Sequence, residues 1–127
     1  YLEPLNRYEN HMILLVQGAV SYRKVGGLAN VLVAADYSHM NIEEAVIEDT
    51  LRSYADYIGR IHLASSQRLQ PGMGHLDYLP GFKTLHASGY TGGCTVECRV
   101  SDDDALAAYD ASAAMLKSKL AEAGFYR

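Results

Sequence analysis

The chain has 127 residues, 49% of them hydrophobic, and a formal net charge of −4 at pH 7. This length supports one hydrophobic core rather than two, so we expect a single domain over residues 1–127. The acidic balance argues against a nucleic-acid-binding protein, which usually presents a basic face, and no stretch of the sequence approaches the ~20 apolar residues that a membrane span needs.

Signal segments and cysteines bear on the location of the protein. No basic segment followed by an apolar one is present, although the sequence begins without Met and an upstream targeting segment stays open. Cys94 and Cys98 lie in one predicted strand, where reduced thiols are a better interpretation than a disulfide. We therefore expect a cytoplasmic protein.

The N-terminal third predicts a strand, a helix and a second strand. The first apolar run is YLEPL at residues 1–5, and apolar residues recur at helical spacing over 12–20 until Gly26 and Gly27 end that segment. NVLVAAD at residues 30–36 is nearly continuous in apolar residues, which is typical of a strand buried on both faces.

A second helix and a third strand are expected next. Asn41, with Glu44 three residues later, resembles a capping box, and an apolar stripe at helical spacing runs from Ile47 to Ile58. IGRIHLA at residues 58–64 predicts the third strand, and a long loop follows it.

The last third predicts a short helix, a fourth strand and a final helix. The short helix covers 79–88 and ends at Gly89, and GCTVECRV at residues 93–100 is the strand. Ser101 and the run Asp102–Asp104 suit a helix N-terminus, where anionic side chains meet the positive end of the macrodipole. The apolar stripe of the final helix consists of Leu106, Tyr109, Ala113, Leu116 and Leu120.

The order of elements is therefore β-α repeated four times. Such alternation predicts an α/β fold with a parallel sheet and right-handed crossovers. A complete (β/α)₈ barrel needs about 250 residues, so four units amount to half of one. An open four-stranded α/β sheet is also compatible with the pattern alone.

Each predicted strand ends near one side chain that can bind a metal. These side chains are Glu3, Asp36, His62 and Glu97. Taken singly, a carboxylate at a strand end is more often a turn former or cap, and a lone histidine is more often a core residue. Four of them at the same edge of a parallel sheet favour a metal site, because the βα loops converge there. Three carboxylates and one imidazole favour Mn²⁺, Mg²⁺ or Co²⁺, with Zn²⁺ also open.

Four segments carry a family resemblance. EPLNRYE, ADYSHMNIEE, HLASSQRLQPGMGHLD and TVEC resemble the C-terminal half of a xylose-isomerase-like TIM barrel of the sugar phosphate isomerase/epimerase family. Within that family the sequence is most similar to ketose 3-epimerases of the D-tagatose and D-psicose type, from Leu2 to about Val100. The resemblance implies a (β/α)₄ half barrel, with residues 1–127 corresponding to strands 5–8 and their helices.

The resemblance also implies roles for individual residues. The family's metal ligands fall on Glu3, Asp36, His62 and Glu97, the four residues at the strand ends. Its substrate contacts fall on Glu9, His39 and Arg68. The implied cofactor is a divalent metal ion, Mn²⁺ first, and the implied partner is a small-molecule sugar. The implied reaction is proton abstraction α to a ketose carbonyl through an enediolate, with Glu3 and Glu97 exchanging protons on opposite faces of the substrate.

The sequence departs from the family pattern beside the predicted ligands. Ser65, Ser66 and Gln67 replace an acidic or glycine-acidic pair followed by Asn, Tyr37-Ser38 stands inside the segment that leads to His39, and Cys98 replaces a proline. These changes bear on substrate identity more than on the metal. An aldose–ketose isomerase, an inosose dehydratase and a non-catalytic half-barrel assembly or metal-binding module stay as alternatives. An endonuclease IV-like activity is disfavoured, because this acidic chain has only five histidines.

A half barrel of this kind is expected to leave apolar surface uncovered. We expect the inward faces of its strands to carry Leu2, Val31, Val33, Ile61 and Val96. At about 25 cal/mol per Å², a few hundred Å² of exposed apolar surface costs an amount comparable to a domain's net stability. The resemblance therefore implies completion by a two-fold homodimer that closes eight strands, or by a missing N-terminal half.

Overall fold

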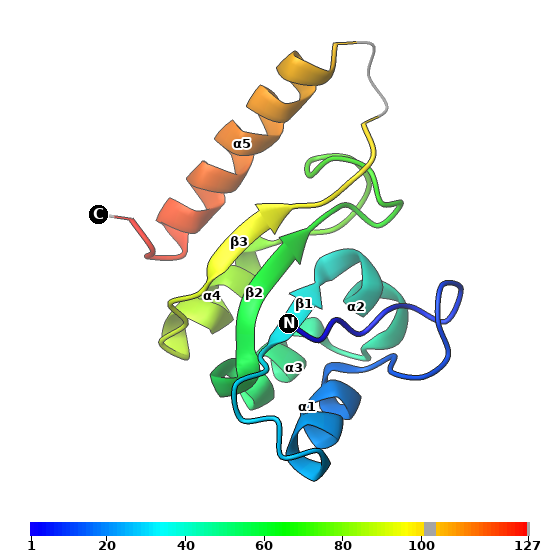
Figure 1. The fold of residues 1–127 in the computed structure, drawn as a ribbon. Coiled ribbons are helices and arrows are strands. Elements are labelled where there is room, and N and C mark those ends of the chain that lie inside the picture. The colour runs from blue at the N-terminus through cyan, green and yellow to red at the C-terminus, as the bar shows by residue number, and fades with distance from the viewer. Residues whose placement is uncertain (101–103, 127) are drawn as a thin grey trace.

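The computed structural model describes residues 1–100 and 104–126, which form an α/β fold around a three-stranded parallel sheet (Figure 1). The strands are β1 (Val33–Asp36), β2 (Ile58–Leu63) and β3 (Gly93–Val96), in the order β1-β2-β3. Their parallel register aligns Asp36 with His62 and His62 with Thr95. The carboxyl ends of the strands therefore meet at one edge of the sheet, as the alternating sequence pattern predicts.

Helices connect the strands and flank the sheet. They are α1 (Val16–Val25), α2 (Tyr37–Glu43), α3 (Ile47–Tyr54), α4 (Leu79–Ala87) and α5 (Ala105–Glu122), with a 3₁₀ turn at Ala55–Tyr57. In Figure 1, α3 and α4 lie behind the sheet, and the long helix α5 runs beside β3. The helix over 79–88 is confirmed, and Gly89 ends it with φ +72°, a conformation that glycine adopts without strain.

The covered face of the sheet holds the apolar side chains, which corrects the expectation about inward-facing residues. Val33 and Ile61 are fully buried against the helices, in one cluster with Leu51 and Phe82. Side chains alternate along β2, so its other face carries polar groups. Leu2 and Val96 pack against the helix-side core as well, and Val31 precedes β1. The uncovered face therefore exposes less apolar surface than the sequence pattern suggests.

The first predicted strand is reduced to a single bridge. Leu2 pairs in parallel with Val33, its amide donating to Leu32 O at 2.8 Å and its carbonyl accepting from Ala34 N at 3.0 Å. Pro4 has no N–H to continue the ladder, so regular pairing stops there. The bridge still holds the N-terminal segment beside β1, where a fourth strand would lie.

The start of α1 and the proposed capping box differ from the sequence prediction. Met12 is 79% exposed, and α1 begins only at Val16, whose amide donates to Glu44 Oε1 at 2.9 Å. Asn41 lies inside α2, and the N-cap of that helix is Asp36, which accepts from His39 N at 3.0 Å. Glu44 thus caps a helix distant in sequence, a tertiary contact that no local spacing predicts.

Two further boundaries also differ. β3 ends at Val96 rather than at residue 100, although Arg99 forms an isolated parallel bridge with Leu69. Asp104 caps α5 by accepting from Ala107 N at 3.0 Å, while Ser101, Asp102 and Asp103 lie outside the described residues. The buried residues of α5 are Ala108, Ser112 and Leu116, so Leu106 and Tyr109 of the predicted stripe are exposed. Ser112 takes this place because its Oγ donates to Pro71 O at 2.7 Å.

Two sequence predictions concern the thiols and membrane-spanning helices of the described residues. Cys94 and Cys98 are both free thiols. Among the described helices, none has the length and apolar composition that crossing a membrane requires.

Candidate metal centre

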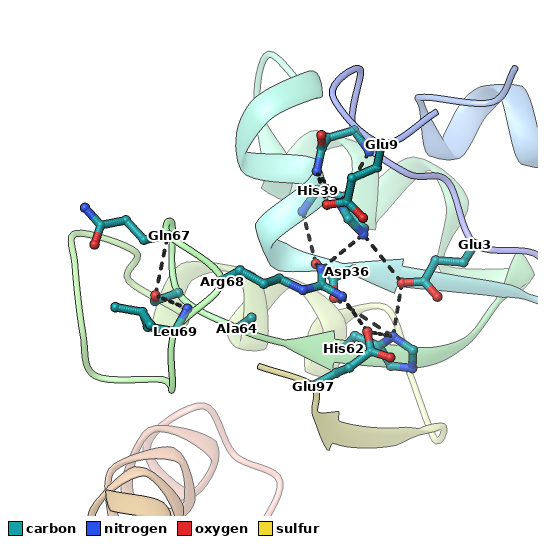
Figure 2. A network of polar contacts seen from close by, with 12 residues as sticks. Glu3, Glu9, Asp36, His39, His62, Ala64, Gln67, Arg68, Leu69 and Glu97 are labelled. Carbon is teal, nitrogen blue, oxygen red and sulfur yellow. Dashed lines mark hydrogen bonds and ion pairs between the residues drawn. The ribbon is translucent and has the colours of Figure 1, made fainter. Parts of the chain in front are cut away.

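Four potential metal ligands converge where the strands end. Glu3, Asp36, His62 and Glu97 each offer one ligand atom, and these atoms all lie within 4.8 Å of one another. Glu3 follows the Leu2 bridge, Asp36 closes β1, His62 lies near the end of β2, and Glu97 follows β3. The four residues therefore come from four adjacent segments of the sheet, as the strand-end positions predict. Figure 2 shows their side chains turned toward one another.

Asp36 is the most deeply buried member of the cluster. Its side chain is 0% exposed, and Oδ1 accepts from His39 N and pairs with Arg68 Nη1 at 2.9 Å. Oδ2 is buried and has no hydrogen-bond partner within residues 1–100 and 104–126. Burial raises the pKa of the Asp36 carboxyl, and the nearby Arg68 partly offsets this effect. A buried carboxylate oxygen without a partner is costly unless a cation or proton satisfies it.

His62 lies between the carboxylates. Its Nδ1 is 3.2 Å from Glu3 Oε1 and 3.2 Å from Glu97 Oε2, and 3.9 Å from Asp36 Oδ2. One imidazole nitrogen thus faces three carboxylate groups at short range. A divalent ion at this place would replace mutual repulsion among the three carboxylates with coordination.

Arg68 reaches into the cluster from the loop after β2 (Figure 2). Its Nη2 donates to Glu97 Oε2 at 2.6 Å, and its Nη1 lies 3.0 Å from His39 Nε2. The backbone of Arg68 adopts φ +60°, and the carbonyl of this residue accepts from Arg99 N at 2.7 Å. A left-handed arginine is uncommon, so the loop holds this side chain in a defined direction.

His39 and Glu9 form a second layer through Asn6. Asn6 N and Nδ2 lie 3.3 and 2.8 Å from His39 Nδ1, and Asn6 Nδ2 also donates to Glu9 Oε1 at 2.9 Å. Two N–H donors face Nδ1, so this nitrogen accepts and the proton of the neutral ring lies on Nε2. Burial lowers the pKa of His39, which favours the neutral ring.

Asn6 is the residue of this site that the sequence pattern does not identify. It is only 5% exposed, and its Oδ1 accepts from Tyr8 N at 3.0 Å, an Asx turn that shapes the segment leading to Glu9. The available signal is its position in EPLNRYE, two residues after the proline that ends the N-terminal pairing. Asparagine there is an ordinary turn former, so its contact with a residue 33 positions away has no local signature.

The departures from the family pattern after β2 lie in the loop that carries Arg68. Ser65 Oγ accepts from Leu69 N at 3.1 Å and from Gln67 N at 3.4 Å. Figure 2 shows Gln67 pointing away from the metal-ligand cluster. These residues thus build the turn and leave Arg68 as the side chain that reaches the site.

The donor set fits a divalent ion on the chemistry present. Oxygen ligands from three carboxylates with one imidazole suit hard cations, and the unpartnered Asp36 Oδ2 offers a free ligand atom. A cavity of about 350 Å³ also exists, but it lies between β3 and α5, lined by apolar residues that include Val96, Leu116 and Leu120. That groove is separate from the cluster.

Known proteins match this chain in sequence and in fold. The family model described as "Xylose isomerase-like TIM barrel" matches residues 1–119. The 3-dehydro-D-guloside 4-epimerase of Escherichia coli K12 is 40% identical over 118 residues, which is 93% of this chain and 45% of that protein. The D-psicose 3-epimerase of Ruminiclostridium cellulolyticum is 36% identical over 96 residues, which is 76% of this chain and 33% of that protein.

Solved structures agree with the sequence matches. The crystal structure of 3-keto-D-glucoside 4-epimerase from E. coli superposes with a TM-score of 0.90 at 40% identity, covering 93% of this chain and 45% of that one. An L-ribulose 3-epimerase structure gives a TM-score of 0.91 at 27% identity, covering 96% and 47%. This chain therefore spans less than half the length of the proteins that it matches.

Proposed function

Because the chain belongs to the xylose isomerase-like TIM barrel family, we propose that it carries the metal centre and acid–base residues of a divalent-metal-dependent ketose epimerase. The observation that carries the proposal is the convergence of Glu3, Asp36, His62 and Glu97 within 4.8 Å. Related proteins that act on sugars support the substrate class. The ion that we propose is Mn²⁺, with Mg²⁺, Co²⁺ and Zn²⁺ as alternatives for the same donor set.

The proposed reaction uses two glutamates on opposite sides of the substrate. A bound divalent ion supplies Lewis-acid polarisation of the ketose carbonyl. One carboxylate removes the proton from C3, the C–H electron pair forms a C2–C3 double bond, and the carbonyl electrons move to oxygen. The other glutamate, initially protonated, delivers its proton to the opposite face of C3, and exchange with water restores both groups. Glu3 and Glu97 suit these roles because they follow the two outermost segments of the sheet.

Glu9, His39 and Arg68 are the proposed substrate contacts. With Nδ1 accepting from Asn6, the neutral His39 ring presents its Nε2 proton toward the cluster as a hydrogen-bond donor. Arg68 supplies a cationic donor beside it, which suits an oxygen that gains negative charge during proton abstraction.

A second candidate is epimerisation at C4 of a 3-keto-glycoside. The 40% identity to 3-dehydro-D-guloside 4-epimerase over 93% of this chain favours it. The chemistry is the same one carbon further along: a C3 carbonyl acidifies C4–H as a C2 carbonyl acidifies C3–H. The two candidates differ in the carbon that exchanges its proton.

Proton exchange in deuterated water tests the proposal and separates the two candidates. The protein, in the assembly that it forms in solution, is incubated with Mn²⁺ and either D-psicose or a 3-keto-glucoside, and deuterium is located by NMR. We expect incorporation at C3 of the ketose, or at C4 of the glycoside if the second candidate holds. Glu97→Gln should keep the fold and reduce exchange by at least about 10²-fold. Exchange by Glu97→Gln at the parent rate would contradict the acid–base assignment, and no exchange with either sugar at any metal loading would favour a non-catalytic module.

A further inference from the structure

We propose that Arg68 is the resident counter-cation of the metal-free site, and that a divalent ion must displace its guanidinium from Glu97 in order to bind. The inference rests on the proposed metal centre but not on the proposed reaction. Displacement frees the guanidinium for the substrate, so that metal binding prepares the substrate contact.

The contacts of Arg68 support this role. Its Nη1 lies 2.9 Å from Asp36 Oδ1 and its Nη2 lies 2.6 Å from Glu97 Oε2, so one guanidinium links the carboxylates that follow β1 and β3. Glu97 Oε2 also lies 3.2 Å from His62 Nδ1, which is itself a candidate ligand atom. The atom of Glu97 that faces the other ligands is therefore the atom that Arg68 holds.

The third neighbour of the guanidinium, His39, is unfavourable. His39 Nδ1 accepts from Asn6, so the Nε2 of the neutral ring carries a proton, and Arg68 Nη1 lies 3.0 Å from that nitrogen. Two N–H groups then face each other, which is not a hydrogen bond. The polar contacts that hold the guanidinium are therefore the two carboxylates, and a cation that takes over Glu97 removes one of them and leaves the pair with Asp36.

Asp36 Oδ2 is a carboxylate oxygen that Arg68 leaves without a counter-cation. Arg68 occupies Oδ1 and leaves Oδ2 buried without a partner among the described residues. One cation with a fixed planar fork cannot satisfy three carboxylates, whereas a divalent ion can coordinate several at once. Arg68 is therefore a partial substitute for the ion, and it lowers the apparent metal affinity of the free protein.

Calorimetric titration with Mn²⁺ alone tests the inference. The main variant is Arg68→Asn, because asparagine tolerates the left-handed backbone at φ +60° and carries no charge. We expect it to bind Mn²⁺ about tenfold more tightly than the parent in the absence of sugar, equivalent to about 1.4 kcal/mol. Arg68→Lys keeps the charge on a different side chain and should fall between the two.

Arg60→Gln is the matched control for the loss of one positive charge. Arg60 lies on the same face of β2 as His62, but its Nη1 donates to Thr95 Oγ1 at 2.6 Å rather than to a candidate ligand. We expect its Mn²⁺ affinity to change by less than about twofold. An equal gain of Mn²⁺ affinity in Arg60→Gln and Arg68→Asn would show a general effect of charge and overturn the inference. Unchanged or weaker Mn²⁺ binding by Arg68→Asn would overturn it as well.

Thermal unfolding gives a second readout that does not depend on turnover. Without metal, Arg68→Asn should have a lower Tm than the parent, because Asp36 and Glu97 lose their counter-cation. Saturating Mn²⁺ should raise the Tm of the variant by more than that of the parent. An equal rise in both proteins would contradict displacement. If deuterium exchange is absent but these differences are present, the proposed reaction fails and the role of Arg68 stands.

Discussion

Residues outside the candidate metal-ligand set hold the segment that carries Asn6 and Glu9. Glu43 at the end of α2 accepts from Arg7 N at 2.6 Å and from Arg7 Nε and Nη2 at 3.0 and 2.9 Å. The Arg7 side chain, its backbone amide and its charge lower the pKa of the Glu43 carboxyl from its usual 4.5. This contact ties the loop after the N-terminal segment to the helix that contains His39.

The paired carboxyl gives a pH-dependent prediction. A lowered pKa means that Glu43 stabilises the fold above its unfolded pKa and loses that contribution as pH falls through its folded pKa. Glu43→Gln should therefore have a lower Tm than the parent at pH 7, and the difference should disappear in acid, below pH 4.5. Asp49→Asn, which breaks an exposed pair with Arg52, is the control and should change the Tm little. A difference between Glu43→Gln and the parent that persists unchanged in acid would contradict the role of the ionised carboxylate.

At the scale of helices and strands, the sequence pattern predicts some positions and misses others. The strands follow from apolar runs, and the strand ends identify Glu3, Asp36, His62 and Glu97 as neighbours, because parallel strands bring their carboxyl ends together. Helix starts are less predictable. Glu44 accepts from Val16 N at the start of α1 across 28 residues, and Met12 lies outside the helix. The direction of Arg68 depends on one left-handed residue, and no spacing in the sequence specifies it.

Two glycines at the same position of their helices should respond in opposite ways to alanine. Gly18 is the third residue of α1, and an added Cβ would meet only Ile13 Cγ2 at 3.6 Å. Gly81 is the third residue of α4, and an added Cβ would overlap the Tyr37 hydroxyl and approach Leu51 Cδ1 at 3.2 Å. We expect Gly18→Ala to stabilise the protein by up to about 1 kcal/mol and Gly81→Ala to destabilise it by about 1–3 kcal/mol or more in denaturant unfolding.

The hydroxyl of Tyr37 provides the check on this explanation. It is buried without a hydrogen-bond partner among the described residues, so Tyr37→Phe should cost little by itself. The double variant Gly81→Ala/Tyr37→Phe should recover much of the stability that Gly81→Ala loses. No recovery in the double variant would mean that backbone strain, rather than overlap with this hydroxyl, is responsible.

At the scale of the whole molecule, the sheet has an unfinished edge. β3 is the last strand on its side, and the apolar groove of about 350 Å³ between β3 and α5 lies beside it. An unpaired parallel edge invites further pairing. The chain covers 45% of the 4-epimerase relative, so we propose that the edge is completed by the N-terminal segment of a second copy or by an N-terminal half.

Light scattering over a concentration series tests this completion. We expect a species of two chains at micromolar concentration, with unfolding that depends on concentration. Cys94 is exposed on β3, and Cys94→Lys should shift the protein toward one chain by placing a charge at the pairing edge. Val25→Lys, at a site on α1 that is 91% exposed, is the control and should leave the mass unchanged. A compact single chain with concentration-independent unfolding would contradict the homodimer.

The span from Glu3 to Glu97 contains every candidate ligand and each proposed substrate contact. In evolutionary terms, the proposed chemistry is therefore separable from a segment that would complete the barrel. A recombination event upstream of Glu3 would join the same acid–base and metal residues to a new N-terminal half. Under the proposed reaction, the recombined protein would keep proton abstraction and gain a different wall of the sugar site. Fusion of this chain to the first halves of several epimerases should therefore change which sugar is used while the exchange step is inherited intact.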